Sequence, residues 1–182
     1  AKTIKEESSR LISLIEDIIK LSQLDEETVP DEKEEIDVLA AAEEVARRLK
    51  TKADEEQVTI SVSGSSVCIM GVGYILDEII YNLCDNAIKY NKKGGTVEVS
   101  VNQQGEDCLL SVKDTGIGIP KSDLKRVFER FYRVDKSHSK ATGGTGLGLS
   151  IVKHAVSYLD GELEIDSIEN EGTEINIRFK AV

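Results

Sequence analysis

The sequence predicts an α+β fold, an α/β two-layer sandwich with a mixed sheet and helices on one face, preceded by one long amphipathic helix. Segments in which apolar residues alternate are interspersed with helical segments that are apolar on one side only, and the chain has no internal repeats. Helices of this kind bury their apolar side against one face of a sheet. At 182 residues the chain fits one domain plus a short appendage.

The first expected element is a helix over residues 3–27. Its apolar residues recur at three- and four-residue spacing: Leu11, Leu14, Ile15, Ile18, Ile19, Leu21 and Leu24. This stripe is wider than a surface helix needs, and the chain begins within the pattern. We therefore expect the helix to belong to a bundle whose other members are missing or come from another chain. Each uncovered Leu or Ile forgoes roughly 1.5–3 kcal/mol of burial, which predicts self-association.

An acidic linker around Pro30 separates this helix from the sandwich, in which alternation and helical spacing define the elements. The expected strands are 35–38, 58–62, 67–70, 96–102, 107–113, 162–168 and 173–180. The expected helices are 39–55, 73–91, 121–126 and 146–159, and residues 127–145 are expected to be irregular. Turns at Gly94–Gly95, Gly105 and Gly172 join neighbouring strands or a helix and a strand.

The charge is distributed unevenly. The formal net charge of −11 disfavours a polyanionic partner, and the absence of Trp disfavours a nucleic-acid stacking surface. Residues 121–140 are nevertheless basic, which suits either a solvated helix face or a phosphate-bearing ligand. Three widely spaced cysteines indicate small buried residues of a reducing compartment. No apolar run is long enough to span a membrane.

Four polar residues share one face of the expected helix 73–91: Glu78, Asn82, Asn86 and Lys89. Asparagine carbonyl oxygens are neutral ligands for Mg²⁺, which relies on phosphate oxygens and water for the rest of its shell. Lys89 can reach the same phosphates. A polar helix face on water is the alternative interpretation.

Two glycine-containing segments complete the pattern. Asp114 ends a strand and is followed by Thr115-Gly116-Ile117-Gly118, so its carboxylate can accept from the exocyclic amine of adenine, the base that we expect to fit here in place of guanine. The glycines permit close backbone approach, and Thr115 can add a hydroxyl or a water bridge. Residues 143–148 read Gly-Gly-Thr-Gly-Leu-Gly and open a helix, whose free amides can bind phosphate. No Lys-Ser/Thr pair follows, so this is not a P-loop.

In this order the segments resemble the ATP-binding domain of sensor histidine kinases, within the superfamily that includes type II topoisomerase, mismatch-repair and chaperone ATPases. Asn82 to Lys89 resembles the N box, Asp114 to Gly118 the G1 box, residues 128–133 the F box, and Gly144-Thr145-Gly146-Leu147-Gly148 the G2 box. Gly172-Thr173 resembles the closing glycine–threonine pair. Helix 3–27 resembles the second helix of the dimerisation hairpin.

The resemblance implies a Bergerat-type ATP-binding fold and a role for each matched residue. Asn82 and Asn86 would hold Mg²⁺, and Lys89 and Tyr90 would contact phosphate and ribose. Asp114 would bind the adenine amine, with Thr115, Gly116 and Gly118 shaping the pocket. Arg130 would stabilise the transferring phosphate. Residues 133–145 would form a mobile lid over ATP, with Gly144, Thr145, Gly146, Leu147, Gly148 and Thr173 completing the phosphate and base contacts.

Some positions depart from the family pattern. The acceptor histidine lies in a motif close to His-Glu-x-x-x-Pro, and neither His138 nor His154 has that context. The chain is therefore expected to bind ATP without carrying its own acceptor. His138 is expected to be solvated, and His154 to lie on a helix surface. Val72 and Gly73 stand where the family often has an Asp capping the N-box helix. Glu78 is either a general base or a polar support.

The sequence thus predicts three regions: residues 1–29 from a dimerisation hairpin, a linker at 30–35, and an ATP-binding kinase catalytic domain at 36–182. The expected cofactors are ATP and Mg²⁺, and the expected partners are a response regulator and a phosphoacceptor helix domain, with a homodimer in the full protein. No nucleic acid or direct membrane contact is expected. The expected location is cytoplasmic, with a parent chain that can be a membrane sensor. An ATP-hydrolysing clamp, a non-catalytic nucleotide module and an anti-sigma serine kinase are the alternatives.

Overall fold

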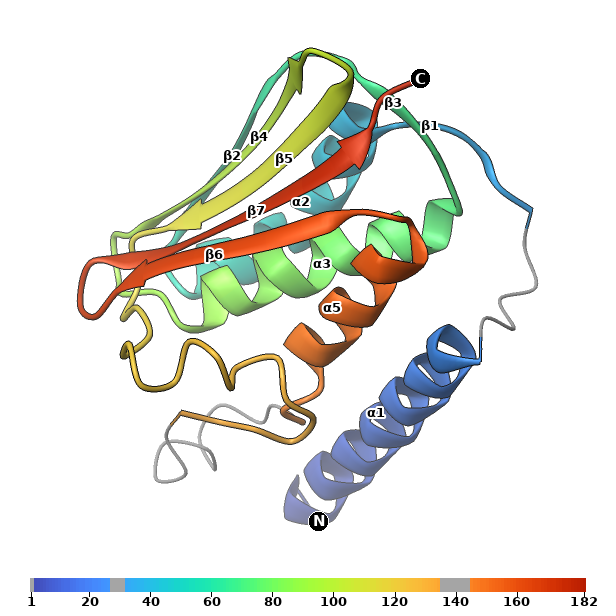
Figure 1. Ribbon diagram of the computed structural model, residues 1–182. Coiled ribbons are helices and arrows are strands. Elements are labelled where there is room, and N and C mark those ends of the chain that lie inside the picture. Colours follow the sequence, from blue (N-terminus) through green and yellow to red (C-terminus); the bar gives the residue numbers. More distant parts are fainter. Residues whose placement is uncertain (1, 27–31, 135–144) are drawn as a thin grey trace.

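A computed structural model of the chain describes residues 2–26, 32–134 and 145–182 (Figure 1). A long helix, α1 (Lys2–Asp25), precedes the sandwich. The sandwich contains helices α2 (Val38–Glu55), α3 (Gly73–Lys89) and α5 (Gly148–Tyr158). Its strands are β1 (Glu34–Asp37), β2 (Thr59–Gly64), β3 (Cys68–Gly71), β4 (Thr96–Gln104), β5 (Asp107–Asp114), β6 (Glu162–Ile168) and β7 (Gly172–Lys180). The predicted α+β class with a leading helix is confirmed.

The main sheet is mixed, as predicted. Its strands run in the order β2-β4-β5-β7-β6, with β2 parallel to β4 and every other pair antiparallel. A smaller antiparallel pair, β1 and β3, joins it through a bridge between Ile69 and Ala181. The order places the end of β5, at Asp114, beside the start of β7, at Gly172 and Thr173.

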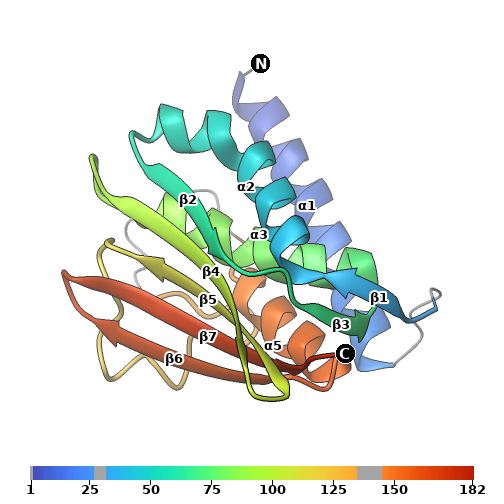
Figure 2. The same cartoon turned by 90° about the horizontal axis from the view of Figure 1, so that it is seen from above.

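Helices α2, α3 and α5 cover one face of the main sheet (Figure 2). Their inward residues form a single core with the sheet, and Ile79, Ile80 and Ile177 are fully buried in it. Strands β2 and β6 alternate between partly buried and exposed residues, as expected for a sheet with one solvated face. The burial of one side of α3 determines which side is left for a ligand.

Two local predictions were wrong. Residues 121–126 form a series of turns, closed by bonds such as Val127 N to Asp123 O (3.0 Å), and not a helix. None of these six residues is buried, and Val127 after them is, so a short helix would have little packing to offset the cost of nucleation. The helix after the glycines begins at Gly148 and not at Gly146, because Gly146 adopts a φ of +76°.

The apolar stripe of α1 is divided between two environments. Leu21 is buried against Leu147 and Ile151, with Leu14 and Leu24 packed around them. In contrast, Leu11, Ile12, Ile15, Ile18 and Ile19 are 46–57% exposed. The sandwich therefore covers one edge of the stripe and leaves the other uncovered, in agreement with the expected width of the pattern.

Two of the three cysteines are buried as predicted, whereas Cys68 is only partly buried. Cys84 and Cys108 are buried, and burial raises the pKa of the Cys84 thiol to about 12. A thiol with this pKa is unreactive at neutral pH.

Candidate nucleotide-binding site

The polar face of α3 carries an ordered pair of side chains. The Asn82 side-chain amide nitrogen donates to the carbonyl oxygen of Glu78 at 2.8 Å and to its carboxylate at 2.9 Å. Because both of these partners are acceptors, the amino group of Asn82 must face them. Its carbonyl oxygen is therefore free to face a ligand. Glu78 acts as a polar support in this arrangement, one of its two predicted roles.

The glycine segment meets α3 at Asn82. A Cβ atom added to Gly148 would lie 3.0 Å from Asn82 Oδ1 and 3.7 Å from Asn86 Nδ2. Gly148 is also the first residue of α5, and its amide belongs to the unpaired group at that helix start. No side chain caps the helix at Leu147. Two amide side chains and a set of backbone donors thus converge where phosphates and a metal were predicted.

Asp114 lies near the C-terminal end of α3. Its carboxylate accepts from the Gly116 amide at 2.7 Å, and the Thr173 amide also donates to it. Burial raises the pKa of Asp114, and these two bonds lower it in part. A Cβ on Gly116 would meet the Tyr90 carbonyl oxygen at 2.4 Å, so the turn packs directly on the end of α3.

Gly118 allows two backbone segments to lie close together, whereas its predicted approach to a base stays a prediction. Its φ of +64° lies in the left-handed region, and a Cβ there would lie 2.1 Å from Ile168 O. Next to it, Ser167 accepts from the Ile119 amide at 2.8 Å and shares a hydrogen bond with the Thr173 hydroxyl at 2.8 Å. Ser167 ties the Asp114 turn to the β6–β7 end of the sheet, and no motif in the sequence singles it out.

Thr115 has a partner other than the one expected. Its hydroxyl accepts from the Thr96 amide at 2.9 Å and lies 3.5 Å from Asn91 Oδ1. Thr115 therefore joins the start of β4 to Asn91, which follows Tyr90 at the end of α3. A contact with a base or a water stays a prediction for this side chain.

Lys89 lies in a positive environment. Burial lowers its pKa, and the Arg133 guanidinium lowers it further, whereas Asp85 raises it. The Lys89 ammonium also lies 5.4 Å from the centre of the Tyr90 ring, within cation–π range. Lys89 and Arg133 are close enough for each positive charge to disfavour the other. Such a pair favours the binding of an anion between or beside the two side chains. Sequence reasoning did not assign Arg133 a separate role, because Arg130 in the same basic run drew the assignment.

Arg130 and His154 both contact α1. The Arg130 guanidinium donates to Asp25, and His154 Nδ1 lies 2.8 Å from the other carboxylate oxygen of Asp25. His154 is therefore half-buried and paired with an acid from a distant segment, where the sequence predicted a plain helix-surface residue. The predicted phosphate contact of Arg130 would require it to exchange or share this partner.

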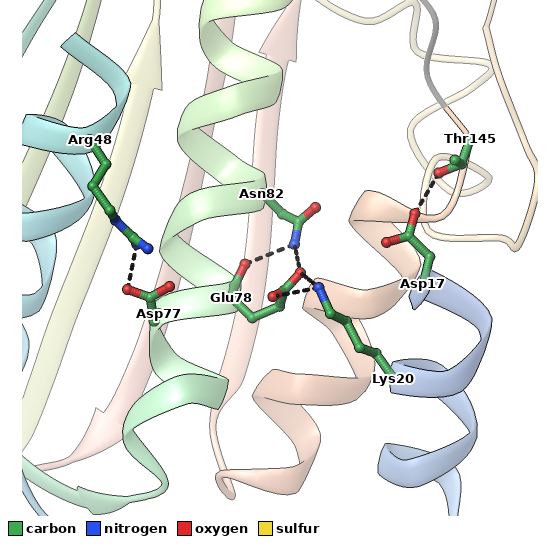
Figure 3. Close-up of polar contacts among 7 residues, drawn as sticks. All are labelled: Asp17, Lys20, Arg48, Asp77, Glu78, Asn82 and Thr145. Atoms are coloured by element: carbon green, nitrogen blue, oxygen red, sulfur yellow. Dashed lines mark hydrogen bonds and ion pairs between the residues drawn. The ribbon is translucent and has the colours of Figure 1, made fainter. Parts of the chain in front are cut away.

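Two more contacts join α1 to the site (Figure 3). The Thr145 hydroxyl donates to Asp17 at 2.9 Å, and the Lys20 ammonium lies 2.9 Å from Glu78. Sequence reasoning missed Asp17, Lys20 and Asp25 because α1 was assessed by its apolar residues alone. Their positions beside Leu21 and Leu24 on one helix face were the available signal. Gly144, His138 and most of the predicted lid lie outside the described residues.

The donor set fits Mg²⁺. Among the described residues no group of three or more His, Cys, Asp or Glu side chains could hold a metal ion. Mg²⁺ instead uses few protein oxygens and completes its shell with phosphates and water. The free Oδ1 of Asn82 beside the start of α5 meets that requirement.

Comparison with known proteins agrees with this geometry. Residues 71–182 match the family described as histidine kinase-, DNA gyrase B- and HSP90-like ATPase. The chain belongs to this family. It is 40% identical over 175 residues to the sensor-like histidine kinase SenX3 of Mycolicibacterium smegmatis, covering 95% of this chain and 45% of that protein. It is 36% identical over 172 residues to the sensor histidine kinase WalK of Bacillus subtilis, covering 93% of this chain and 28% of that protein.

A solved structure shows the same likeness. The mycobacterial sensor histidine kinase MprB superposes with a TM-score of 0.72 at 28% identity, covering 82% of this chain and 97% of that one. The prediction of an ATP-binding catalytic domain of the sensor histidine kinase class is confirmed, and the clamp and the non-catalytic module are not favoured. The chain spans less than half the length of SenX3 or WalK. In the part of the chain that the structure describes, no helix has the length and apolarity to cross a membrane.

Proposed function

We propose that this chain binds Mg-ATP along α3 and supplies its γ-phosphate to a histidine on a dimerisation hairpin of the parent protein, for relay to an aspartate of a response regulator. The observation that carries the proposal is the convergence of two separate glycine segments on α3. Gly148 meets Asn82, and Gly116 meets Tyr90 at the far end. This spacing suits a ligand with a base at one end and phosphates at the other.

Each residue has a role in this proposal. Asp114 accepts from the adenine amine, because the Gly116 and Thr173 amides orient its carboxylate. Asn82 and Asn86 hold Mg²⁺, which would neutralise phosphate charge. Lys89 and Arg133 bind phosphate oxygens, together with the amides that begin α5. Arg130 would stabilise the transferring phosphate after it exchanges or shares its partner Asp25.

The transfer breaks the bond between the γ-phosphorus and the β–γ bridging oxygen and forms a phosphorus–nitrogen bond to the imidazole, with ADP leaving. Positioning and charge stabilisation are most of what this step needs from a protein. The exposed apolar residues of α1, including Leu11 and Ile15, would pack against the other helix of the hairpin and against the hairpin of a second copy of the protein. The hairpin, linker and catalytic boundaries at 1–29, 30–35 and 36–182 are part of the same proposal.

A transfer assay tests the proposal. The chain is mixed with a separate acceptor hairpin, with and without its histidine, and with ATP labelled at the γ-phosphate. We expect label on the histidine-containing hairpin that is lost in acid and retained in base. Acid-stable label would indicate a serine kinase. Release of labelled phosphate without any labelled hairpin would indicate a hydrolase.

A further inference from the structure

The face of α1 that touches the sandwich is charged as well as apolar. Leu21 fills the space over Leu147 and Ile151, and a carboxylate lies on either side of it along the helix. Asp17 accepts from the Thr145 hydroxyl at 2.9 Å, and Asp25 accepts from the Arg130 guanidinium. Lys20, between them, is paired with Glu78 at 2.9 Å (Figure 3).

These acids reach groups at the phosphate end of the candidate site. Thr145 is separated from Gly148 by two residues and also accepts from the Leu147 amide at 3.3 Å. Asp17 is half-buried there, and burial raises its pKa; the Thr145 hydrogen bond and the Lys20 ammonium lower the pKa in part, and the nearby Glu78 raises it. A carboxylate in this position is poorly solvated and lies near a second acid. A phosphate chain brought to the start of α5 would add more negative charge to the same place.

We propose that Asp17 and Asp25 of α1 compete with the phosphates of the nucleotide for the same hydrogen-bond donors. Docking of α1 on the sandwich and binding of ATP would then oppose each other. This inference rests on the proposed function. A hydroxyl has one proton to donate, so Thr145 cannot donate to Asp17 and to a phosphate oxygen together. The two carboxylates also repel a polyanion directly. The carboxylates of α1 thus occupy donors that phosphate oxygens would otherwise take.

The consequence is a built-in coupling between helix position and nucleotide affinity. Binding equilibria are reciprocal, so ATP weakens the docking of α1 by the same factor by which docked α1 weakens ATP. Because the other edge of α1 is apolar and exposed, a bundle that engages that edge can shift the helix and thereby change the affinity of the site. A shift in the position of α1 would thus change the affinity for the nucleotide through Asp17, Leu21 and Asp25.

The test compares ligands with and without phosphates. Asp17→Asn keeps an acceptor oxygen for Thr145 but removes the charge, and Asp25→Asn does the same for Arg130. The matched control is Glu16→Gln, which removes one negative charge at the neighbouring, exposed position on α1. Calorimetry measures the Kd of Mg-ATP and of adenosine for the unmodified chain and for each variant, and circular dichroism checks that each is folded.

We expect Asp17→Asn to bind Mg-ATP about fivefold or more tightly than the unmodified chain, which is the lower end of typical coupling. Asp25→Asn should change in the same direction. The Kd of adenosine should change less than about twofold in all variants, and the Kd of Mg-ATP for Glu16→Gln should match that of the unmodified chain. If one Asp variant fails to fold, the other decides.

Either of two outcomes overturns the inference while leaving the proposed function intact. In the first, the folded Asp variants bind Mg-ATP no more tightly than Glu16→Gln does. In the second, adenosine and Mg-ATP tighten in parallel, so that the effect is not at the phosphates. If the unmodified chain binds no Mg-ATP at all, the proposed function fails and this inference fails with it.

Discussion

Replacing Gly148 with alanine separates the stability of α5 from the geometry of the phosphate site. Gly148 is the first residue of α5, and its φ is not in the left-handed region. Alanine is favoured over glycine in a helix by roughly 0.5–1 kcal/mol. On backbone grounds alone the substitution should leave the protein as stable as before, or slightly more stable.

The added methyl group nevertheless has no room on the side of α5 that faces Asn82. It would lie 3.0 Å from Asn82 Oδ1, which must move by a few tenths of an ångström. Asn82 cannot turn away freely, because Glu78 holds its amino group through two hydrogen bonds. Because disturbing the orientation of a metal ligand typically costs about 10- to 100-fold in metal affinity, this shift should weaken Mg-ATP binding roughly tenfold.

Gly73→Ala is the matched control. Gly73 is the first residue of α3, and a Cβ there would approach only the end of the flexible Glu34 side chain, at 3.2 Å. Thermal unfolding and calorimetry with Mg-ATP would be measured for both variants. We expect an unchanged or higher Tm for both and weaker Mg-ATP binding for Gly148→Ala alone. Wild-type affinity in Gly148→Ala would refute the placement of the metal and phosphates beside Asn82.

The same geometry leads to three further predictions. Asp114→Asn should lower ATP affinity by about 10- to 100-fold in calorimetry, because a charge-assisted bond of about 1.5–3 kcal/mol is lost, whereas Asp166→Asn on exposed β6 should not. Burial lowers the pKa of Lys89, and a bound phosphate would raise it again, so ATP affinity should fall as the pH rises from about 7 to about 10. Lys89→Gln should bind more weakly and lack this pH dependence; a dependence that survives in Lys89→Gln would assign it to another group. Leu21→Ala should reduce the hydrogen-exchange protection of α1 by about 2–3 kcal/mol, because Leu21 is buried. Ile15→Ala changes a half-exposed residue and should chiefly weaken self-association, measured by sedimentation. Equal effects of the two substitutions on protection would contradict the observed packing.

The long, strongly periodic elements could be predicted from the sequence. The spacing of Leu76, Ile80 and Leu83 on α3 places the apolar side of the helix away from Glu78, Asn82 and Lys89, so periodicity alone identifies the polar face. The glycine motifs likewise indicate where backbone and ligand can approach closely. Helix α3 begins at Gly73, as expected, although no side chain caps it at Val72.

Contacts between distant segments could not be predicted in the same way. The Asp25–His154 pair joins residues 129 positions apart, and the bond from Thr145 to Asp17 joins residues 128 apart. No local pattern encodes which acid meets which hydroxyl or imidazole. The turns at 121–126 are a second case, because the charged residues there fit a helix or a turn equally well and packing decides between them.

The nucleotide preference of the unmodified chain tests most directly whether Asp114 selects adenine and whether α3 and the glycine segment form one site. Calorimetric titrations with ATP, ADP and GTP in the presence of Mg²⁺ measure this preference. We expect heat of binding for ATP and ADP and none for GTP. Equal binding of GTP, or no binding of any nucleotide by the folded protein, would contradict the proposed site.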